Sequence, residues 1–474
     1  MRKEGEKPVG KFFEAIGNIF RIPDLRKRVL FTFAMLAVYR FGSFVPTPGI
    51  DVIRWQDFFN HQGGGVFGFF DLFAGGNIRR LSVFALGIMP YITASIILQL
   101  LTVVVPTLEK LQKEGELGRR KITQWTRYLT VGLGIAQSFG IAISLQGMQD
   151  NIVIHPGIGF VLMTILSLTT GTAFIMWLGE QITERGVGNG MSLIIFTGIV
   201  VGVPGAIGNL YTNVFVTHEW NALELGLIIV VMIAVVAFIV LVELGERRIP
   251  VQYAKRVIGR RVMGGTSTHM PLKVNAGGVI PVIFASSILA FPQTIATFPA
   301  VRNNAWLTNT LTSIRPGEPL WFIFFVALII FFCFFYVSII FNPNEAADNM
   351  RKYGGFIPGI RPGRSTSDYM NTILTRITFV GAIYLAILCI IPQVMMNGIH
   401  LQHLPLIGNA IDRTFPRFIL EGLNVQFYFG GTSLLIVVGV AMDTINQVEA
   451  QLIMRHYEGF TPRAGRIRGR RSGY

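Results

Sequence analysis

The chain is poor in charge and in cysteine for its length. Only 14% of its 474 residues are charged, whereas soluble domains average about 25%. Together with 51% hydrophobic residues, this excludes a string of ordinary soluble domains and predicts one integral membrane domain. The two cysteines, Cys333 and Cys389, both fall in apolar segments. We therefore expect them to be small buried side chains without a disulfide.

Signatures of catalysis are missing as well. The sequence has no G-x-x-x-x-G-K-[ST] loop, so any energy for transport has to come from a partner or a gradient. His400 and His403 have no cysteine or well-placed carboxylate near them in the sequence. We therefore expect them to be ordinary loop histidines and not metal ligands. We expect no enzyme activity and no cofactor. The apolar segments almost lack Asp and Glu, the groups that proton-coupled carriers titrate. This favours a passive conduit, and a sodium-coupled transporter stays open as the alternative.

The chain does contain about ten apolar stretches, each near the 20 residues that a membrane span needs. Of its 41 basic residues, 32 lie in every second connection or in the two tails. This alternation predicts a polytopic helical protein with both termini in the cytoplasm. The predicted spans are 29–46, 81–106, 128–145, 158–178, 190–210, 225–244, 277–297, 320–341, 377–396 and 425–442.

Five spans in each half place the second half upside down relative to the first, the inverted-repeat plan of many transport proteins. The predicted regions are a cytoplasmic amphipathic segment 1–28, halves 29–210 and 225–442, and a basic cytoplasmic tail 443–474. Residues 66–74 are too short to cross and are bracketed by glycines. They predict a re-entrant or pore-filling half-helix, with a packed turn outside the membrane as the alternative.

Two cytoplasmic loops, 245–275 and 343–372, have too many patterned positions for simple linkers. In the first, alternating apolar residues from Ile249 to Tyr253 lead to Gly259, which predicts a projecting hairpin with a basic tip for an acidic partner. In the second span, Ile88, Ile92, Ile96 and Gln99 fall on one helical face. That face indicates a gated path, or ordinary helix packing.

Several segments together resemble the SecY family, the central subunit of the bacterial protein-conducting channel. They lie in family order along nearly the whole chain: FALGIMPYI at 84–92, KEGE at 113–116, RRK at 119–121, GEQITERGVGNG at 179–190, RRIP at 247–250, GRRV at 259–262, PLKVN at 271–275, GGFIPGIRPG at 354–363 and FGGTSLLI at 429–436.

The resemblance implies an all-α fold of two inverted halves, an hourglass pore, a short plug helix and a lateral gate. One position departs from the family, because Met191 stands where isoleucine is common, and methionine is more flexible. The implied pore ring is Ile88, Ile92, Met191, Ile195, Ile283 and Ile436; the plug is Val66, Phe67, Phe69, Phe70, Leu72 and Phe73; the lateral gate is Thr93, Gln99, Asn275 and Phe291; the loops for a motor or ribosome carry Lys255, Arg256, Arg260, Arg261 and Arg361.

By the same resemblance, we expect passage of unfolded secretory polypeptides across the bacterial plasma membrane and sideways release of hydrophobic segments into the bilayer. The implied partners are the translocating polypeptide, the small membrane subunits SecE and SecG, the motor ATPase SecA, the ribosome and membrane lipids. No specificity for nucleic acid is expected beyond contact with ribosomal RNA. A small-solute secondary transporter of the same inverted plan is the alternative function.

Overall fold

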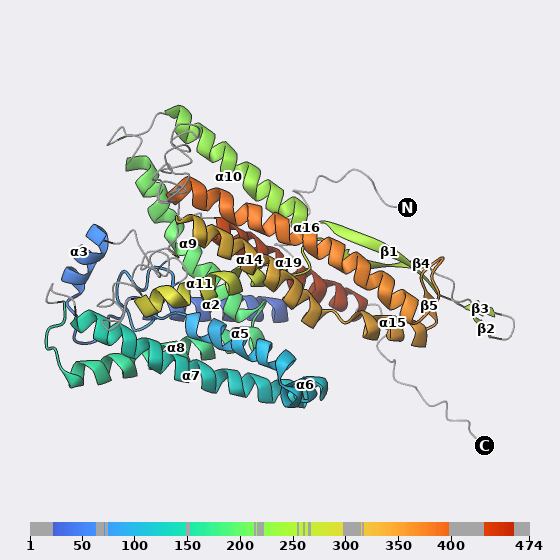
Figure 1. The fold of residues 1–474 in the computed structure, drawn as a ribbon, viewed down its shortest axis with the longest axis horizontal. Helices are drawn as coiled ribbons and strands as arrows, with labels where there is room; N and C mark the ends of the chain where they lie inside the picture. Colours follow the sequence, from blue (N-terminus) through green and yellow to red (C-terminus); the bar gives the residue numbers. More distant parts are fainter. Residues whose placement is uncertain are drawn as a thin grey trace, which may run out of the picture.

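The computed structural model describes residues 22–62, 71, 74–147, 152–212, 215, 222–253, 256–258, 261–263, 267–296, 314, 317–397 and 431–458. The described chain is an elongated helical bundle with a small β-structure at one end (Figure 1). Its helices are α2 (Pro23–Gly42), α3 (Val52–Gln62), α5 (Met89–Val104), α6 (Pro106–Lys113), α7 (Glu116–Gln146), α8 (Ile158–Arg185), α9 (Gly190–Tyr211), α10 (Ala222–Glu243), α11 (Ile280–Ala296), α14 (Pro319–Ile340), α15 (Pro343–Lys352), α16 (Arg364–Asn397) and α19 (Gly431–Glu458).

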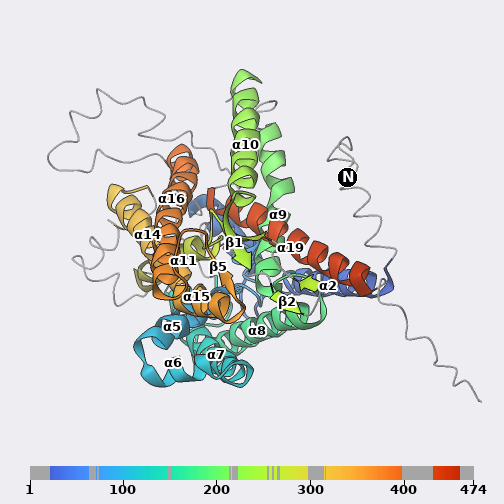
Figure 2. The same ribbon diagram turned by 90° about the vertical axis from the view of Figure 1, so that its right-hand side faces the viewer.

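Each predicted span overlaps one long helix, namely α2, α5, α7, α8, α9, α10, α11, α14, α16 or α19. Within the described residues, five helices are long and apolar enough to cross a membrane, or six if α5 and α6 form one bent span. Parts of α9, α10 and α11 are shorter apolar helices. In Figure 2, α5 to α8 lie together beneath α11, α14 and α16. The prediction of a mostly helical membrane protein is therefore confirmed.

The second predicted span, 81–106, is shorter and more broken than its sequence indicated. Residues 81–88 form turns, and the helix begins only at Met89. At the other end Pro106 keeps Val105 extended, with φ −98° and ψ 112°, and the chain bends by 100° into α6. A residue before proline is pushed out of the helical region by the proline ring, which explains the break.

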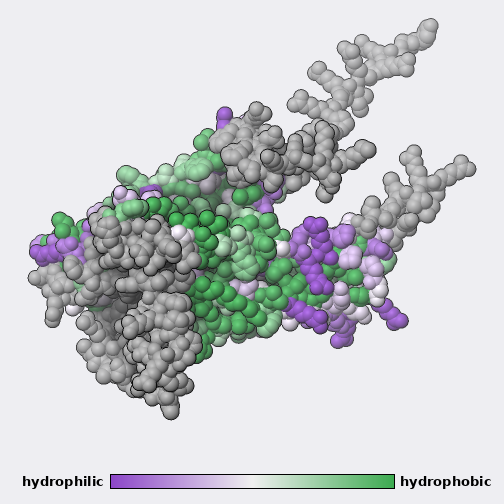
Figure 3. All heavy atoms as spheres, turned by 90° about the horizontal axis from the view of Figure 1, so that it is seen from above, coloured by the Kyte–Doolittle hydropathy of each residue, from purple (hydrophilic) through white to green (hydrophobic). Residues whose placement is uncertain are grey.

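Other helices run past their predicted limits at the ends predicted to be cytoplasmic. α7 begins at Glu116, α16 begins at Arg364 and α19 continues to Glu458. The added turns carry charged side chains, so hydropathy alone did not assign them to the spans. Space-filling colours show a broad apolar band with hydrophilic residues at both ends (Figure 3). The band is what the hydrocarbon region of a bilayer requires.

Small residues allow the helices to approach closely. A Cβ on Gly171 of α8 would overlap the carbonyl of Val83, and one on Gly190 of α9 would overlap the carbonyl of Gly179. On α19, a Cβ at Gly439 would overlap Val279. In a bilayer, lipid tails are as apolar as the helix surfaces, so helices gain little hydrophobic free energy by associating. Close van der Waals packing at small residues stabilises their association instead.

The two cytoplasmic loops fold as one unit. Strand β1 (Glu246–Tyr253) pairs antiparallel with β4 (Ser267–Lys273), and β5 (Gly355–Phe356) of the second loop adds to the other edge of β1. A second ladder of β2 (Arg256–Ile258) and β3 (Arg261–Met263) extends the hairpin outward. Ile249 and Val251 pack with Met370 on α16 in a shared hydrophobic cluster. The projecting hairpin is confirmed, and its joining to the second loop was not predicted.

Candidate pore, plug anchor and gate

The six residues implied as a pore ring lie in one hydrophobic cluster. Ile92 of α5, Ile195 of α9 and Ile436 of α19 are buried in it, and Ile436 is fully inaccessible. Ile88 is also buried, whereas Met191 and Ile283 are partly buried at its edge. This large cluster joins helices from both halves of the chain, and the six positions are among its members. An apolar region between the halves can close a path to ions by excluding water.

Ile88 stands at the start of the face predicted for Ile92, Ile96 and Gln99. It is the N-cap residue of α5, after Gly87 with φ +55°, and has φ −95° and ψ −2°. Its carbonyl accepts the backbone N–H of Ile92 at 3.1 Å, the first hydrogen bond of the helix. Ile92 and Ile96 remain buried together in the cluster.

Met191 packs against the neighbouring helix. Its sulfur lies where a Cβ on Gly179 of α8 would be, so this glycine leaves room for the methionine side chain. Ile194 contacts the same place. Contact with α8 therefore reduces the number of conformations open to this flexible side chain.

The segment that follows the predicted plug is anchored to α2 by hydrogen bonds. Tyr39 donates from its hydroxyl to the Ala74 carbonyl at 3.4 Å and accepts from Asn77 Nδ2 at 3.2 Å. Arg40 Nη1 donates to the Gly75 carbonyl at 3.2 Å. These groups are largely buried, so each lost bond leaves an unpaired polar group away from water. The six predicted plug residues themselves lie outside the described residues.

Asp71 forms hydrogen bonds within the same segment, to residues seven and eight positions further along the chain. Its Oδ1 accepts the backbone N–H groups of Ile78 at 2.8 Å and Arg79 at 3.0 Å. Burial raises the pKa of this carboxyl, while the two N–H donors act in the opposite direction. Close by, a Cβ on Gly75 would lie 2.6 Å from Cα of Gly198 on α9, so only glycine fits. We call Tyr39, Arg40, Asp71, Gly75 and Asn77 the plug anchor.

α5 and α11, the two helices of the implied lateral gate, pack against each other. Thr93 donates to the Met89 carbonyl in its own helix, and Gln99 donates to Ser95 at 3.4 Å. Asn275 lies in the turn before α11 and donates to Glu243 Oε2 of α10 at 3.1 Å. The structure therefore ties Asn275 to α10. The side chain of Phe291 is outside the described residues.

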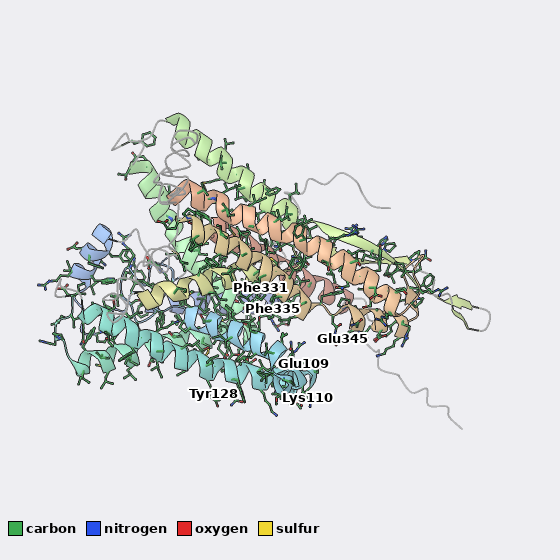
Figure 4. The ribbon with its side chains drawn as sticks, in the orientation of Figure 1. Glu109, Lys110, Tyr128, Phe331, Phe335 and Glu345 are labelled. Carbon is green, nitrogen blue, oxygen red and sulfur yellow. The ribbon has the colours of Figure 1, made fainter. Side chains whose placement is uncertain are left out.

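Charged residues of α6 and α15 lie near one another. Figure 4 places Glu109 and Lys110 of α6 close to Glu345 of α15. Lys113 pairs with Glu109 at 2.6 Å, and both Glu109 and Glu345 raise the pKa of its amine. On α14, Phe331 stacks on Phe335.

Of the predicted docking residues, Arg361 is exposed and its carbonyl accepts a bond from Thr366. Arg256 and Arg261 lie on the paired strands β2 and β3. Lys255 and Arg260 are outside the described residues. In the described part of the chain, no three His, Cys, Asp or Glu side chains lie close enough together to bind a metal ion.

Comparison with known families decides the identity. The model of the SecY family matches residues 82–445. The chain belongs to the SecY family. It is 49% identical over 444 residues to the protein translocase subunit SecY of Escherichia coli strain K12, covering 93% of this chain and 95% of the relative. The SecY of Vibrio cholerae is 47% identical over 447 residues, with 94% and 95% covered.

Solved channel structures share the fold of this SecY chain. One described as the structure of a protein conducting channel matches with a TM-score of 0.62 at 15% identity, covering 96% of this chain and all of the other. Another, described as Sec61 in the canine ribosome-channel complex from the endoplasmic reticulum, gives 0.57 at 14% identity, covering 96% and 100%. The SecY family is a family of channel subunits, so the secondary-transporter alternative and an enzyme are both set aside.

The plug anchor was missed by reasoning from the sequence, although one signal pointed to it. Arg40 is a charged residue within an apolar stretch, a placement that usually marks a functional contact. Its guanidinium also lies 5.3 Å from the ring centre of Phe44, and that of Arg80 lies 4.4 Å from the same ring. Cysteines were predicted correctly, since Cys333 and Cys389 are buried and unpaired with each other.

Proposed function

We propose that this channel subunit passes unfolded secretory polypeptides through the centre of its helical bundle and releases hydrophobic segments sideways between α5 and α11. The observation that supports the proposal is that Ile92 of α5, Ile195 of α9 and Ile436 of α19 are all buried in the large hydrophobic cluster that joins the two halves. The halves 29–210 and 225–442 are the two bodies that separate when a polypeptide enters. Residues 66–74 are the proposed plug of this channel.

An apolar ring suits a channel with many substrates. It denies ions a replacement for their hydration shell, so the resting pore stays closed to them. It also offers a passing peptide no specific partner, because apolar contacts have no fixed direction. The same positions can therefore close around side chains of very different chemistry.

If the bundle opens sideways between α5 and α11, each passing segment is sorted by its free energy of transfer into the bilayer. At a membrane centre Leu or Ile gains about 0.3 to 0.6 kcal/mol, and a charged residue costs about 2.5 to 3.5 kcal/mol. Over about twenty residues these differences separate membrane spans from secreted chain. Phe331 is exposed on α14 and stacks on Phe335, an apolar surface that suits contact with a hydrophobic segment.

The ring is tested by resting ion conductance of the reconstituted translocase in planar bilayers. Replacing Ile195 or Ile436 with Asn should raise the conductance about tenfold to a hundredfold, because an amide stabilises water in the constriction by about 1 to 3 kcal/mol. Ile436→Val keeps the site apolar and is the matched control. Unchanged conductance in the Asn variants would remove these residues from the seal.

We assign the cytoplasmic sheet and its hairpin to docking of the motor SecA and of the ribosome. Support comes from the sequence charge of Lys255, Arg256, Arg260 and Arg261 and from the projecting ladder of β2 and β3. SecE and SecG are the proposed small membrane subunits of the complex. The distribution of Lys and Arg supports a place in the bacterial plasma membrane with both termini in the cytoplasm, where anionic lipids add a further partner.

Docking is tested by binding of the motor or of ribosomes to vesicles that hold the channel. The double change Arg260→Glu and Arg261→Glu should weaken binding by at least about tenfold and steepen the loss with salt, since opposite charges attract over about 10 Å. Arg54→Glu on α3, outside the cytoplasmic loops, is the control. Equal binding of both variants would make the hairpin tip ordinary solvated surface.

A further inference from the structure

The turn between α8 and α9, residues 186–189, is held between helices of the two halves. On one side α2 contributes Thr32, and on the other α19 contributes Thr444. A Cβ at Gly186 would lie 2.5 Å from Thr32 Oγ1, and one at Gly188 would lie 3.2 Å from Thr444 Oγ1. Gly188 has φ +85°, which also favours glycine. The turn is therefore a tight contact between α2 and α19.

Thr32 makes the bond that fixes this turn. Its Oγ1 accepts the backbone N–H of Val187 at 3.1 Å and donates to the Arg28 carbonyl of its own helix at 3.0 Å. Thr32 and Val187 are both buried, with exposed fractions of 8% and 4%. Because a hydroxyl offers one donor and further acceptor capacity, both bonds form at once. Without the acceptor, the Val187 N–H would be buried and unpaired.

The turn leads directly into the helix that carries part of the ring. Asn189 Oδ1 accepts the backbone N–H groups of Met191 at 3.1 Å and Ser192 at 3.5 Å, which sets the start of α9. Gly190 N–H donates to Thr183 Oγ1 of α8 at 2.9 Å. Met191 follows at once and Ile195 one helical turn later. Any shift of the turn moves both ring positions.

We propose that Thr32 is a positioning residue for the pore seal: through Val187 its hydroxyl sets the first turn of α9 and thereby the place of Met191 and Ile195 in the ring. The inference rests on the proposed ring. Thr32 itself acts from α2, through the backbone of the turn. The bond also explains why the polar side chain of Thr32 is buried one turn after the basic residues of α2.

The test uses the complete translocase complex containing this chain, reconstituted in planar bilayers, with conductance measured per channel at rest. Thr32→Val keeps the shape and removes the acceptor, and we expect an about tenfold higher conductance. Thr32→Ser keeps the acceptor and should conduct like the parent channel. Thr130→Val on α7 is the matched control, because its buried hydroxyl is bonded to the Thr126 carbonyl of its own helix, away from the turn.

A purely structural role would give a different result. Thr32→Val would then lower the amount of inserted complex or its thermal unfolding temperature, with conductance per channel unchanged, and this would overturn the inference. If Thr32→Val does not accumulate, Thr32→Ala removes the same acceptor with less bulk and is read in the same way. Equal leak in Thr32→Ser and Thr32→Val would also overturn it, because the hydroxyl would then not matter.

Ile195→Asn is measured beside these variants. If Ile195→Asn leaks and Thr32→Val does not, the inference is wrong and the ring stands. If Thr32→Val leaks, Thr32→Ser does not and Ile195→Asn leaks, the inference is supported. If Ile195→Asn does not leak, the ring assignment is wrong and the inference is overturned with it.

Discussion

The proposed ring and the plug anchor are neighbours built from different chemistry. At the proposed ring, isoleucines of α5, α9 and α19 are buried in one large cluster of apolar side chains. At the anchor, Tyr39 and Arg40 hold the backbone of residues 74 and 75 by hydrogen bonds. Apolar contact weakens gradually as side chains move apart, whereas a hydrogen bond is lost over a short distance and a small angle.

The difference fits two tasks. A ring that has to close around any side chain needs contacts without direction, so it can widen and return. A plug that has to rest in one place needs contacts that are satisfied in one geometry only. We infer that the anchor sets the resting position of the plug and the ring sets the tightness of the closure around it. The following changes test this comparison, from the largest expected effect to the smallest.

Gly75→Ala should disturb the resting plug most. Its added Cβ would lie 2.6 Å from the backbone of Gly198 and would require a φ of +72°. We expect an about tenfold higher resting conductance, since strain at such a position costs about 1 to 3 kcal/mol. Gly76→Ala is the control for backbone strain alone, because its φ is +81° and nothing lies within 4 Å of its added Cβ. Equal effects of the two changes would show that the contact with α9 is unimportant.

Tyr39→Phe should have a smaller effect. It removes the hydroxyl that bonds Ala74 and Asn77 but keeps the ring stacked on Phe84 at 5.9 Å. Loss of about 1 kcal/mol predicts an about fivefold rise in the open probability of single channels. Tyr384→Phe is the matched control, since the Tyr384 hydroxyl is buried and has no hydrogen-bond partner among the described residues. An unchanged open probability in Tyr39→Phe would argue against a polar anchor.

Arg127→Gln should change least. Arg127 Nε lies 2.7 Å from Glu180 Oε1, but the arginine side chain is 45% exposed. Exposed ion pairs contribute less than about 1 kcal/mol, so the thermal unfolding temperature should fall by less than about 3 °C. Resting conductance should stay that of the parent channel. A large rise in conductance would show that surface charge between α7 and α8 also holds the closed state.

Much of the architecture could be predicted because its causes are local. Apolar length and the alternation of basic residues predicted a polytopic helical membrane protein, and alternating residues around Ile249 predicted the hairpin. The errors lie where a backbone conformation depends on one residue or on packing. Pro106 bends the chain after α5, and the residues up to Gly87 form turns where a continuous span was predicted. Helical periodicity alone treats such residues as part of a continuous span.

The candidate site divides in the same way. The ring residues were predicted from the resemblance to the SecY family. In the structure, Ile88, Ile195 and Ile436 are buried in one large hydrophobic cluster. The polar contacts around them were not predictable, since Tyr39 bonds a residue 35 positions away and Thr32 one 155 positions away. No sequence period connects such partners. In the sequence, Thr32 looks like any helical threonine whose hydroxyl donates to a carbonyl of its own helix. Only the packing of the turn against α2 gives its hydroxyl a second partner.

The sequence by itself determined that the chain is a helical membrane protein with several spans, and it predicts the orientation of its basic face and ten crossings. Each of these follows from the cost of placing a given side chain in hydrocarbon, which neighbouring residues decide together. Only the tertiary structure decided that α2 holds both the plug segment and the start of α9, and that β5 joins β1. Those contacts exist because particular helices pack at small residues, and packing is a property of the whole folded chain.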